Sequence, residues 1–189
     1  TIEDPIEYVY PKSKSLVAQR ELYTDTLNWE NSLRSVLRED PNVVLIGEIR
    51  DADTMRAALQ ISETGHLVFS TMHTNSAAES IERIIYSFDG SEQEQVRAML
   101  SNVVSGIVSQ RLVPVIGGGR IAAVEIMLST PSISNMIRDK KEFQINNVIH
   151  TSSGLGMITL EKSLVDLVRS GKITIDTAHE YSRNAEEVV

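Results

Sequence analysis

Residues 42–51 read NVVLIGEIRD, and this stretch decides the fold expected for the chain. The apolar run from Asn42 to Gly47 is typical of a buried strand. It follows a helix expected over residues 31–38, which Pro41 prevents from continuing because the residue before a proline is forced out of the helical region. A helix followed by a buried strand indicates a βαβ arrangement with a parallel sheet.

The same alternation continues after this strand. Asp51 or Asp53 can cap a helix that runs to about Glu63, and Gly65 suits the left-handed position beyond its end. The elements expected next are a second buried strand over residues 66–72 and a helix, capped by Asn75 or Ser76, that runs to about Tyr86.

From Ser91 onward the pattern changes to a long amphipathic helix, with apolar residues at one-face spacing from Val96 to Val108. Three glycines at 117–119 are expected to turn a hairpin between strands at 112–116 and 121–128. A phosphate cradle is the alternative for these glycines, but it would require a helix after them. Four shorter helices are expected at 132–139, 143–149, 157–170 and 175–181.

The predicted fold class is therefore α/β, with a mostly parallel sheet flanked by helices over residues 1–130 and an α-helical portion over residues 131–189. The chain opens with Thr1 and enters strand-like residues at once, without the basic and apolar regions of a signal peptide. We therefore expect it to be the C-terminal part of a longer protein, truncated at its N-terminus.

Composition excludes several classes of protein. Of the 189 residues, 41% are hydrophobic and 23% charged, which is the usage of folded globular chains. The sequence has no Cys, so disulfides, thiolate metal sites and cysteine nucleophiles are excluded. No apolar run approaches the length of a membrane span. A net charge of −8 argues against general affinity for nucleic acid or anionic membranes.

Acidic residues follow two of the expected strands. Glu48 comes directly after the apolar run at 43–46, at the sheet edge where such folds bind ligands and where nucleoside triphosphatases place an acid that acts on magnesium. Glu3, Asp4 and Glu7 surround Pro5, and such a cluster can bind a divalent cation and leave one acid as a base for water. The alternatives are a solvated strand end for Glu48 and a surface turn around Pro5.

His66 and His73 lie at the two ends of the second strand. Their odd spacing would point the side chains to opposite faces of a regular strand, so joint metal ligation is not indicated. Each could instead sense a phosphate or a carboxylate, while a helix C-terminal contact is the alternative for His66. Arg83 could reach a phosphate on a neighbouring subunit or simply form a surface ion pair.

Three segments occur together in a specific order: TIEDPIEY at 1–8, LRSVLREDPNVVLIGEIRD at 33–51 and TGHLVFSTMHTNSAAESIERI at 64–84. The chain resembles the secretion ATPases, and within them the type IV pilus retraction ATPases (PilT-like). The segments correspond to the aspartate box, the Walker B segment and the histidine box of that family. The resemblance continues through residues 109–128 into the helical tail.

The resemblance implies a RecA-like domain of a hexameric ring that hydrolyses ATP with Mg²⁺ to power pilus retraction and twitching motility. Glu7 would activate or orient the attacking water, and Glu48, the Walker B acid, would act on magnesium through water. The expected nucleotide-binding residues are Glu3, Asp4, His66, His73 and Arg83. The expected location is cytoplasmic, peripheral at the inner membrane beside a platform protein of the pilus, with neither nucleic acid binding nor membrane insertion.

Two features favour retraction within the family. Extension and type II secretion ATPases usually carry a four-cysteine zinc module, and this sequence has no Cys. Retraction ATPases carry the motif AIRNLIRE, and residues 132–139 read SISNMIRD. This stretch keeps Ile133, Asn135, Ile137 and Arg138 but has Ser134 in place of the first arginine.

No G-x-x-x-x-G-K-[ST] phosphate loop occurs in the 189 residues, and in the family this loop lies upstream of the aspartate box. We therefore expect the parent protein to be an ATPase and this piece alone to hydrolyse ATP poorly or not at all. The alternatives are a non-catalytic interaction or scaffold domain, a type II secretion or pilus extension ATPase, and a RecA-like recombinase or helicase. Low aromatic content and the negative charge disfavour the last.

Overall fold

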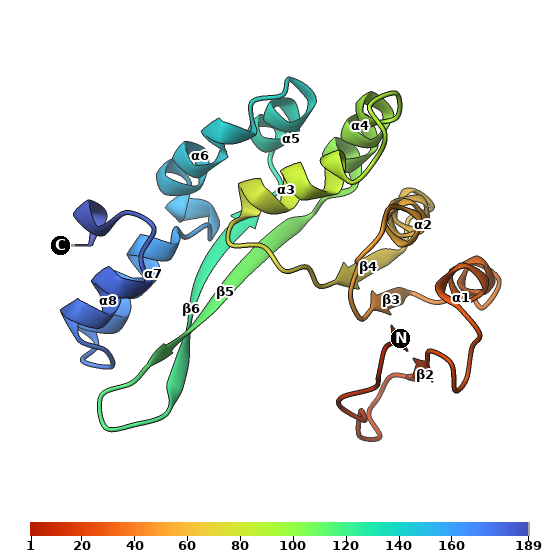
Figure 1. The fold of residues 1–189 in the computed structure, drawn as a ribbon, viewed down its shortest axis with the longest axis horizontal. Coiled ribbons are helices and arrows are strands. Elements are labelled where there is room, and N and C mark those ends of the chain that lie inside the picture. The colour runs from red at the N-terminus through yellow and green to blue at the C-terminus, as the bar shows by residue number, and fades with distance from the viewer. Residues whose placement is uncertain (189) are drawn as a thin grey trace. The chain divides into compact units, whose positions relative to one another are not determined.

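The computed structural model describes residues 1–188 (Figure 1). The chain divides into two compact units, each of which is described by itself. The first unit comprises residues 1–73 and 84–103, and the second comprises residues 74–83 and the chain from Val104 onward. The boundary expected at residue 130 stays a prediction. No described helix is long and apolar enough to cross a bilayer.

The first unit is built on a parallel sheet with strand order β2-β1-β3-β4. Its strands are β1 (Ile2–Glu3), β2 (Arg20–Glu21), β3 (Val43–Ile46) and β4 (Leu67–Ser70). β3 pairs with β4 along its whole length, and Ile46 also faces Ile2 of β1. The parallel sheet expected from the alternation of helices and strands is thus confirmed.

The helices of this unit are α1 (Trp29–Val36), α2 (Ala52–Glu63) and α4 (Gln93–Val103). The second helix begins and ends at the expected signals, whereas the first spans residues 29–36 instead of the expected 31–38, because the Asn28 side chain caps it by accepting from the backbone N–H of Asn31. Of the two candidate caps for α2, Asp51 is used, and its side chain accepts a hydrogen bond of 2.8 Å from the backbone N–H of Thr54. Gly65 has φ +94°, the left-handed conformation predicted beyond the end of this helix.

The core of the first unit lies on one face of the sheet. Ile2, Val44 and Ile46 are buried together with Leu33 of α1 and Ile61 of α2. Figure 1 shows α1 and α2 on the same side of the sheet. Burying this shared apolar face is the main favourable contribution to folding of the unit.

The opposite face of the sheet corrects one expectation. The second strand was expected to be buried, but Leu67 and Phe69 of β4 are 46% and 52% exposed, as is Val43 of β3 at 51%. Within the described residues, β4 has a strand on one side only, and the core helices lie on the other face. An apolar run therefore predicted the strand correctly, but it did not predict whether one or both faces of the strand are buried.

The second unit contains an antiparallel hairpin of β5 (Gly106–Pro114) and β6 (Arg120–Leu128). All three glycines at 117–119 have positive φ, which confirms the expected turn. The long helix predicted to reach Val108 is wrong at its end, because α4 stops at Val103. Ile107 and Val108 pair with Met127 and Ile126 instead, so a nine-residue ladder replaces the last helical turns.

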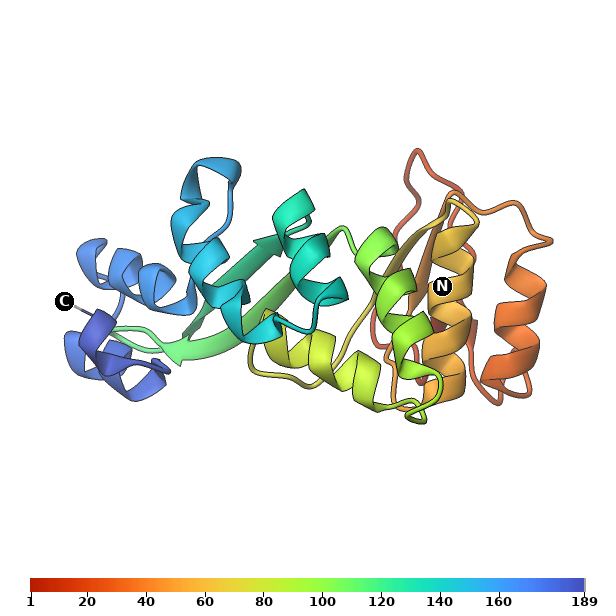
Figure 2. The ribbon, with the colours of Figure 1, turned by 90° about the horizontal axis from the view of Figure 1, so that it is seen from above.

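The remaining elements of the second unit are helical, and the four predicted helices are present, but the one expected from residue 157 begins at Leu160 because Ile158 pairs with Ile126 of β6. The helical elements comprise the start of α3 (Ala77–Tyr86), α5 (Pro131–Arg138), η1 (Glu142–Gln144), α6 (Ile145–Thr151), η2 (Ser153–Leu155), α7 (Leu160–Arg169), α8 (Ile175–Tyr181) and η3 (Ala185–Glu187). α7 packs against β6 and α8 against β5, as the blue helices beside the green strands show in Figure 2. Val113, Ala123 and Leu164 are fully buried between them.

Candidate functional site

The carboxyl ends of three parallel strands meet at one edge of the first unit's sheet. The backbone N–H of Gly47, after β3, donates a 2.8 Å hydrogen bond to the carbonyl of Ile2 in β1. The carbonyl of Gly47 accepts a 2.6 Å hydrogen bond from the Thr71 hydroxyl, and Ile49 N–H donates to the Thr71 carbonyl at 3.1 Å. The residues after these strands are therefore held in one place by the sheet itself.

Gly47 allows this edge to be tightly packed. A Cβ at this position would lie 3.3 Å from the Cα of Glu3, closer than side chains usually approach backbone. The absence of a side chain lets the ends of β1 and β3 come together. Glu48 follows directly, so its carboxylate emerges at the edge where an α/β sheet binds ligands.

Glu48 is the best-held acid at this edge. Its side chain is only 18% exposed; one carboxylate oxygen accepts a hydrogen bond from Nη2 of Arg50, and the other lies 3.5 Å from Nε2 of His73. Arg50 and His73 are themselves mostly exposed. The hydrogen bond from Arg50 is the main reason that the Glu48 pKa is lowered, with a smaller contribution from His73. Glu48 therefore stays ionised to a lower pH than an ordinary glutamate does.

Glu3 and Asp4, both predicted site residues, interact with different partners. Asp4 lies close enough to Arg50 for its charge to help raise the pKa of that guanidinium, after the larger effect of Glu48. Glu3 instead accepts hydrogen bonds from the Thr1 hydroxyl at 2.5 Å and from the Gln19 amide at 3.1 Å. Asp4 therefore belongs to the charged group around Arg50, whereas Glu3 braces the loop that returns toward β2.

The other predicted residues are more scattered. Glu7 is exposed on the segment after β1. His66 precedes β4, and its Nδ1 lies 2.8 Å from the Thr64 hydroxyl, at the amino end of the strand and away from Glu48. Arg83 lies on α3 in the second unit. The structure thus brings Glu48, Asp4 and His73 to one sheet edge, and the roles expected for Glu7, His66 and Arg83 stay predictions.

Sequence reasoning did not single out Arg50 or Thr71. Arg50 stands two residues after the strand-end acid, and an adjacent charge of opposite sign is a signal that could have pointed to it. Thr71 carries no such signal, because its hydrogen bond to Gly47 depends on the pairing of β3 with β4.

The donor set fits part of a magnesium nucleotide site. Within the part of the chain that the structure describes, no three His, Asp or Glu side chains are placed to hold a metal directly. Mg²⁺ usually keeps several waters and needs only one or two protein carboxylates. Glu48, ionised and oriented, fits such a contact through water, whereas the phosphate loop that would bind ATP is not in these 189 residues.

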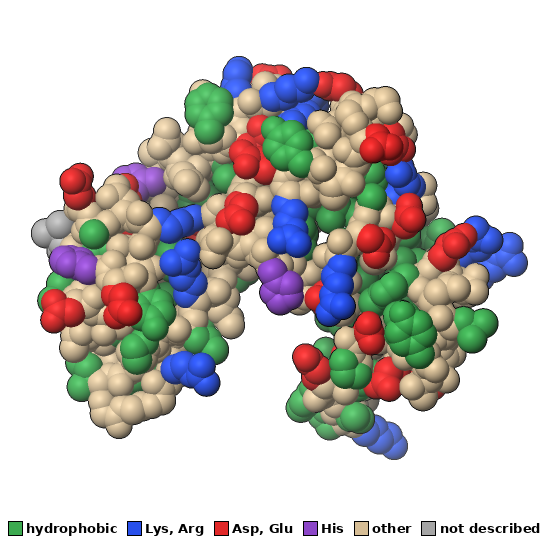
Figure 3. Space-filling view, in the orientation of Figure 1, with side chains coloured by type: hydrophobic (Ala, Val, Ile, Leu, Met, Phe, Trp, Pro, Cys, Tyr) green, Lys and Arg blue, Asp and Glu red, His purple; other side chains and the backbone are tan. Residues whose placement is uncertain are grey.

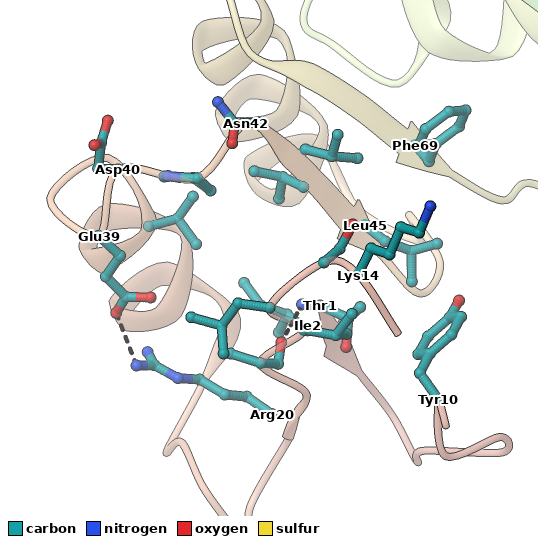
Figure 4. Close-up of a pocket in the computed structure, with 18 residues that line it drawn as sticks. Thr1, Ile2, Tyr10, Lys14, Arg20, Glu39, Asp40, Asn42, Leu45 and Phe69 are labelled. Atoms are coloured by element: carbon teal, nitrogen blue, oxygen red, sulfur yellow. Dashed lines mark hydrogen bonds and ion pairs between the residues drawn. The ribbon is translucent and has the colours of Figure 1, made fainter. Parts of the chain in front are cut away.

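A cavity of about 800 Å³ lies elsewhere in the first unit, beside the exposed face of the sheet (Figure 4). Tyr10, Lys14 and Phe69 line it, and Arg20 forms a 2.8 Å ion pair with Glu39 at its side. None of the predicted site residues is among its lining residues.

The molecular surface visible in Figure 3 carries acidic and basic side chains interspersed with one another. Neither sign of charge dominates this side of the molecule.

Comparison with known proteins identifies the class. The family model described as "Type II/IV secretion system protein" matches residues 1–118. The type IV pilus retraction ATPase PilT of Pseudomonas aeruginosa is 50% identical over 98% of this chain and 54% of its own length. A twitching motility protein of Neisseria gonorrhoeae is 47% identical over the whole chain and 50% of its own length.

A solved structure gives the same result. The crystal structure of the pilus retraction motor PilT with bound ADP superposes with a TM-score of 0.89 at 45% identity, and covers 98% of this chain and 52% of that one. The fold is therefore the α/β fold of this motor. The chain belongs to the type II/IV secretion system protein family, and it spans about half the length of the curated relatives it matches.

Replacing Arg50 by glutamine is expected to raise the Glu48 pKa toward its ordinary value of 4.5. A carboxyl whose pKa is lower folded than unfolded stabilises the fold above its ordinary pKa, and this stabilisation disappears as the pH falls through the lowered value. The variant should therefore lose less stability on acidification than the parent. Carboxyl-carbon NMR titration of Glu48 measures the shift directly.

The matched control is Arg34→Gln, because Arg34 pairs with Glu30 on the exposed side of α1. This variant should leave the Glu48 titration where it was. A Glu48 midpoint that does not move in Arg50→Gln would show that Arg50 is not the group that keeps the acid ionised.

Proposed function

We propose that this chain is the C-terminal part of a hexameric, RecA-like ATPase that hydrolyses ATP to power retraction of type IV pili. The observation that carries the proposal is the extent of the match. The family model ends at residue 118, but the similarity to the retraction ATPase continues through the helical tail to cover 98% of the chain. A chain without Cys also lacks the zinc module expected of extension and type II secretion ATPases.

The site supports a division of labour between the two acids. Bound ATP and Mg²⁺ would supply the phosphoryl group and the charge that neutralises it during transfer. Glu48, kept ionised by Arg50, would hold a water of the magnesium shell. Glu7, exposed beyond the strand end, is free to take a proton from the attacking water. Asp4 would set the charge around Arg50.

The histidine-box residues are proposed to couple the site to the ring. His73 faces Glu48 at 3.5 Å, so a change in the charge or position of Glu48 would be felt by the residue where the chain leaves the first unit. Arg83 lies further along the chain on α3 and is proposed to contact the nucleotide. His66 and Glu3 are proposed to contribute to the same nucleotide-binding site. The ring would act in the cytoplasm against an inner-membrane platform protein of the pilus.

Magnesium-dependent ATP hydrolysis by the protein at its full native length tests the proposal. We expect turnover that requires Mg²⁺, and little or none from the 189-residue chain, because this sequence lacks a phosphate loop. A native-length protein that is folded and oligomeric but inactive would favour the scaffold function. Comparable turnover by the 189-residue chain would contradict the expected incompetence of this piece.

A further inference from the structure

A carboxylate is buried in the hairpin of the second unit. Glu125 of β6 is 1% exposed and interrupts the apolar stretch 121–128. One of its oxygens accepts a 2.8 Å hydrogen bond from the backbone N–H of Ala77, the first residue of α3. The other oxygen pairs with Nη2 of Arg183, beyond α8. A buried carboxylate with both oxygens engaged is costly to disrupt.

Arg183 is in turn held by a second acid. Its backbone N–H donates a 3.0 Å hydrogen bond to the Glu161 carboxylate of α7, and its Nε lies 3.8 Å from the same oxygen. The side chains of Glu161 and Arg183 are 8% and 25% exposed. Arg183 thus stands between two acids from different elements, and only one of them reaches α3.

The amino end of α3 complements the charges of this cluster. Two carboxylates, Glu125 and Glu161, share one guanidinium, so the cluster is one negative charge in excess. The amino end of α3 offers an unsatisfied N–H and the positive end of the helix dipole, both of which stabilise a nearby anion. The contact between Glu125 and Ala77 therefore serves the acid as well as the helix.

Local contacts alone already form the first turn of α3. The Ser76 hydroxyl accepts from the N–H of Glu79 at 3.1 Å, and the Ser80 hydroxyl lies 2.6 Å from that of Thr74. The bond from Ala77 to Glu125 joins residues 48 apart in sequence. Its contribution is therefore to fix the place of this turn on the hairpin, since the turn itself is capped by its neighbours.

We propose that Glu125 is a positioning residue, which holds the amino end of α3 and the residues 74–76 that follow His73. The ion pair with Arg183 keeps the Glu125 carboxylate oriented toward the backbone N–H of Ala77. The effect on turnover rests on the proposed function, because α3 carries Arg83 of the histidine box. The placement of α3 itself does not depend on that function.

The test uses the native-length protein and two readouts. Amide hydrogen exchange over residues 77–80 measures how firmly the amino end of α3 is held in place. ATP turnover measures the effect of this positioning on activity. Glu125→Leu removes both polar contacts in an apolar setting and is expected to speed exchange of the Ala77 amide about tenfold or more, because a hydrogen bond to a charged group is lost. We expect kcat to fall about tenfold with KM for ATP changed less than about twofold.

Two matched variants separate positioning from general stability. Glu125→Gln keeps an oxygen that can accept from Ala77, so it should retain most of the protection at 77–80. Glu161→Leu removes the other acid from Arg183 without touching α3, and exchange at 77–80 should stay as in the parent. Equal effects of Glu161→Leu and Glu125→Leu, or unchanged exchange in Glu125→Leu, would overturn the proposal.

Should Glu125→Leu fail to fold, Arg183→Met provides the comparison with Glu125 still in place. Its expected result is faster exchange at Ala77, and unchanged exchange would count against the proposed role of Arg183. A native-length protein with no ATPase activity would contradict the proposed function alone, because the exchange measurements decide the positioning role independently.

Discussion

Replacing Glu7 by glutamine is expected to lower kcat for ATP hydrolysis by about 10²–10⁴-fold in the native-length protein, the usual contribution of a positioned general base. KM for ATP should change little, because glutamine keeps the size and polarity of the side chain and removes only its ability to accept a proton. The exposure of Glu7 beyond the strand end is compatible with a group that must reach a water molecule.

Glu48→Gln makes this experiment informative about both acids. If Glu48 acts on magnesium through water, its replacement is expected to lower activity about 10–100-fold, as the loss of outer-shell metal partners does. It should also raise the Mg²⁺ concentration needed for half-maximal turnover. Glu63→Gln, an exposed position at the end of α2, is the control and should turn over ATP normally. Full activity in Glu7→Gln would remove this residue from the catalytic step.

The largest effect on stability is expected from Ile46→Ala, which should lower the free energy of unfolding of the first unit by about 2–5 kcal/mol. Ile46 is fully buried and lies between β1 and β4, directly before the segment that presents Glu48. Truncation to alanine removes buried methyl groups and leaves a cavity in the face of the sheet that α1 and α2 cover.

Urea unfolding of the 189-residue chain measures this loss, with the fluorescence of Trp29 as the probe. Trp29 is the single tryptophan of the chain and packs against the same core cluster as Ile46. Leu37→Ala is the control, because Leu37 is 45% exposed beyond the end of α1 and should cost less than about 0.5 kcal/mol. Equal midpoints for the two variants would show that β3 is not the centre of this core.

Features that depend on a few neighbouring residues were predictable. The apolar run of β3, the Asp51 cap of α2 and the left-handed Gly65 after it all follow from short-range sterics and hydrogen bonding. The same holds for the glycine turn of the hairpin. The strand-end position of Glu48 also followed, because a parallel sheet places such residues at its carboxyl edge.

The end of α4 shows why other features were not predictable. The apolar spacing through Ile107 and Val108 suits a helix face, yet both residues are in β5. Residues of β6, up to 22 positions further along the chain, provide a complete ladder of backbone partners for this segment. The spacing of apolar residues depends only on the segment itself. It therefore contains no information about a strand further along the sequence that can pair with the segment.

The sequence by itself determined the order of the α-helices and of the strands other than β2, the family, and the acid at the end of β3. Only the tertiary structure decided which groups surround the acids: Arg50 and His73 around Glu48, and Arg183, 58 residues away, beside Glu125. The physical reason is range. Propensity, capping and turn chemistry act over a few residues, whereas the partner of a buried charge is chosen by how distant elements pack.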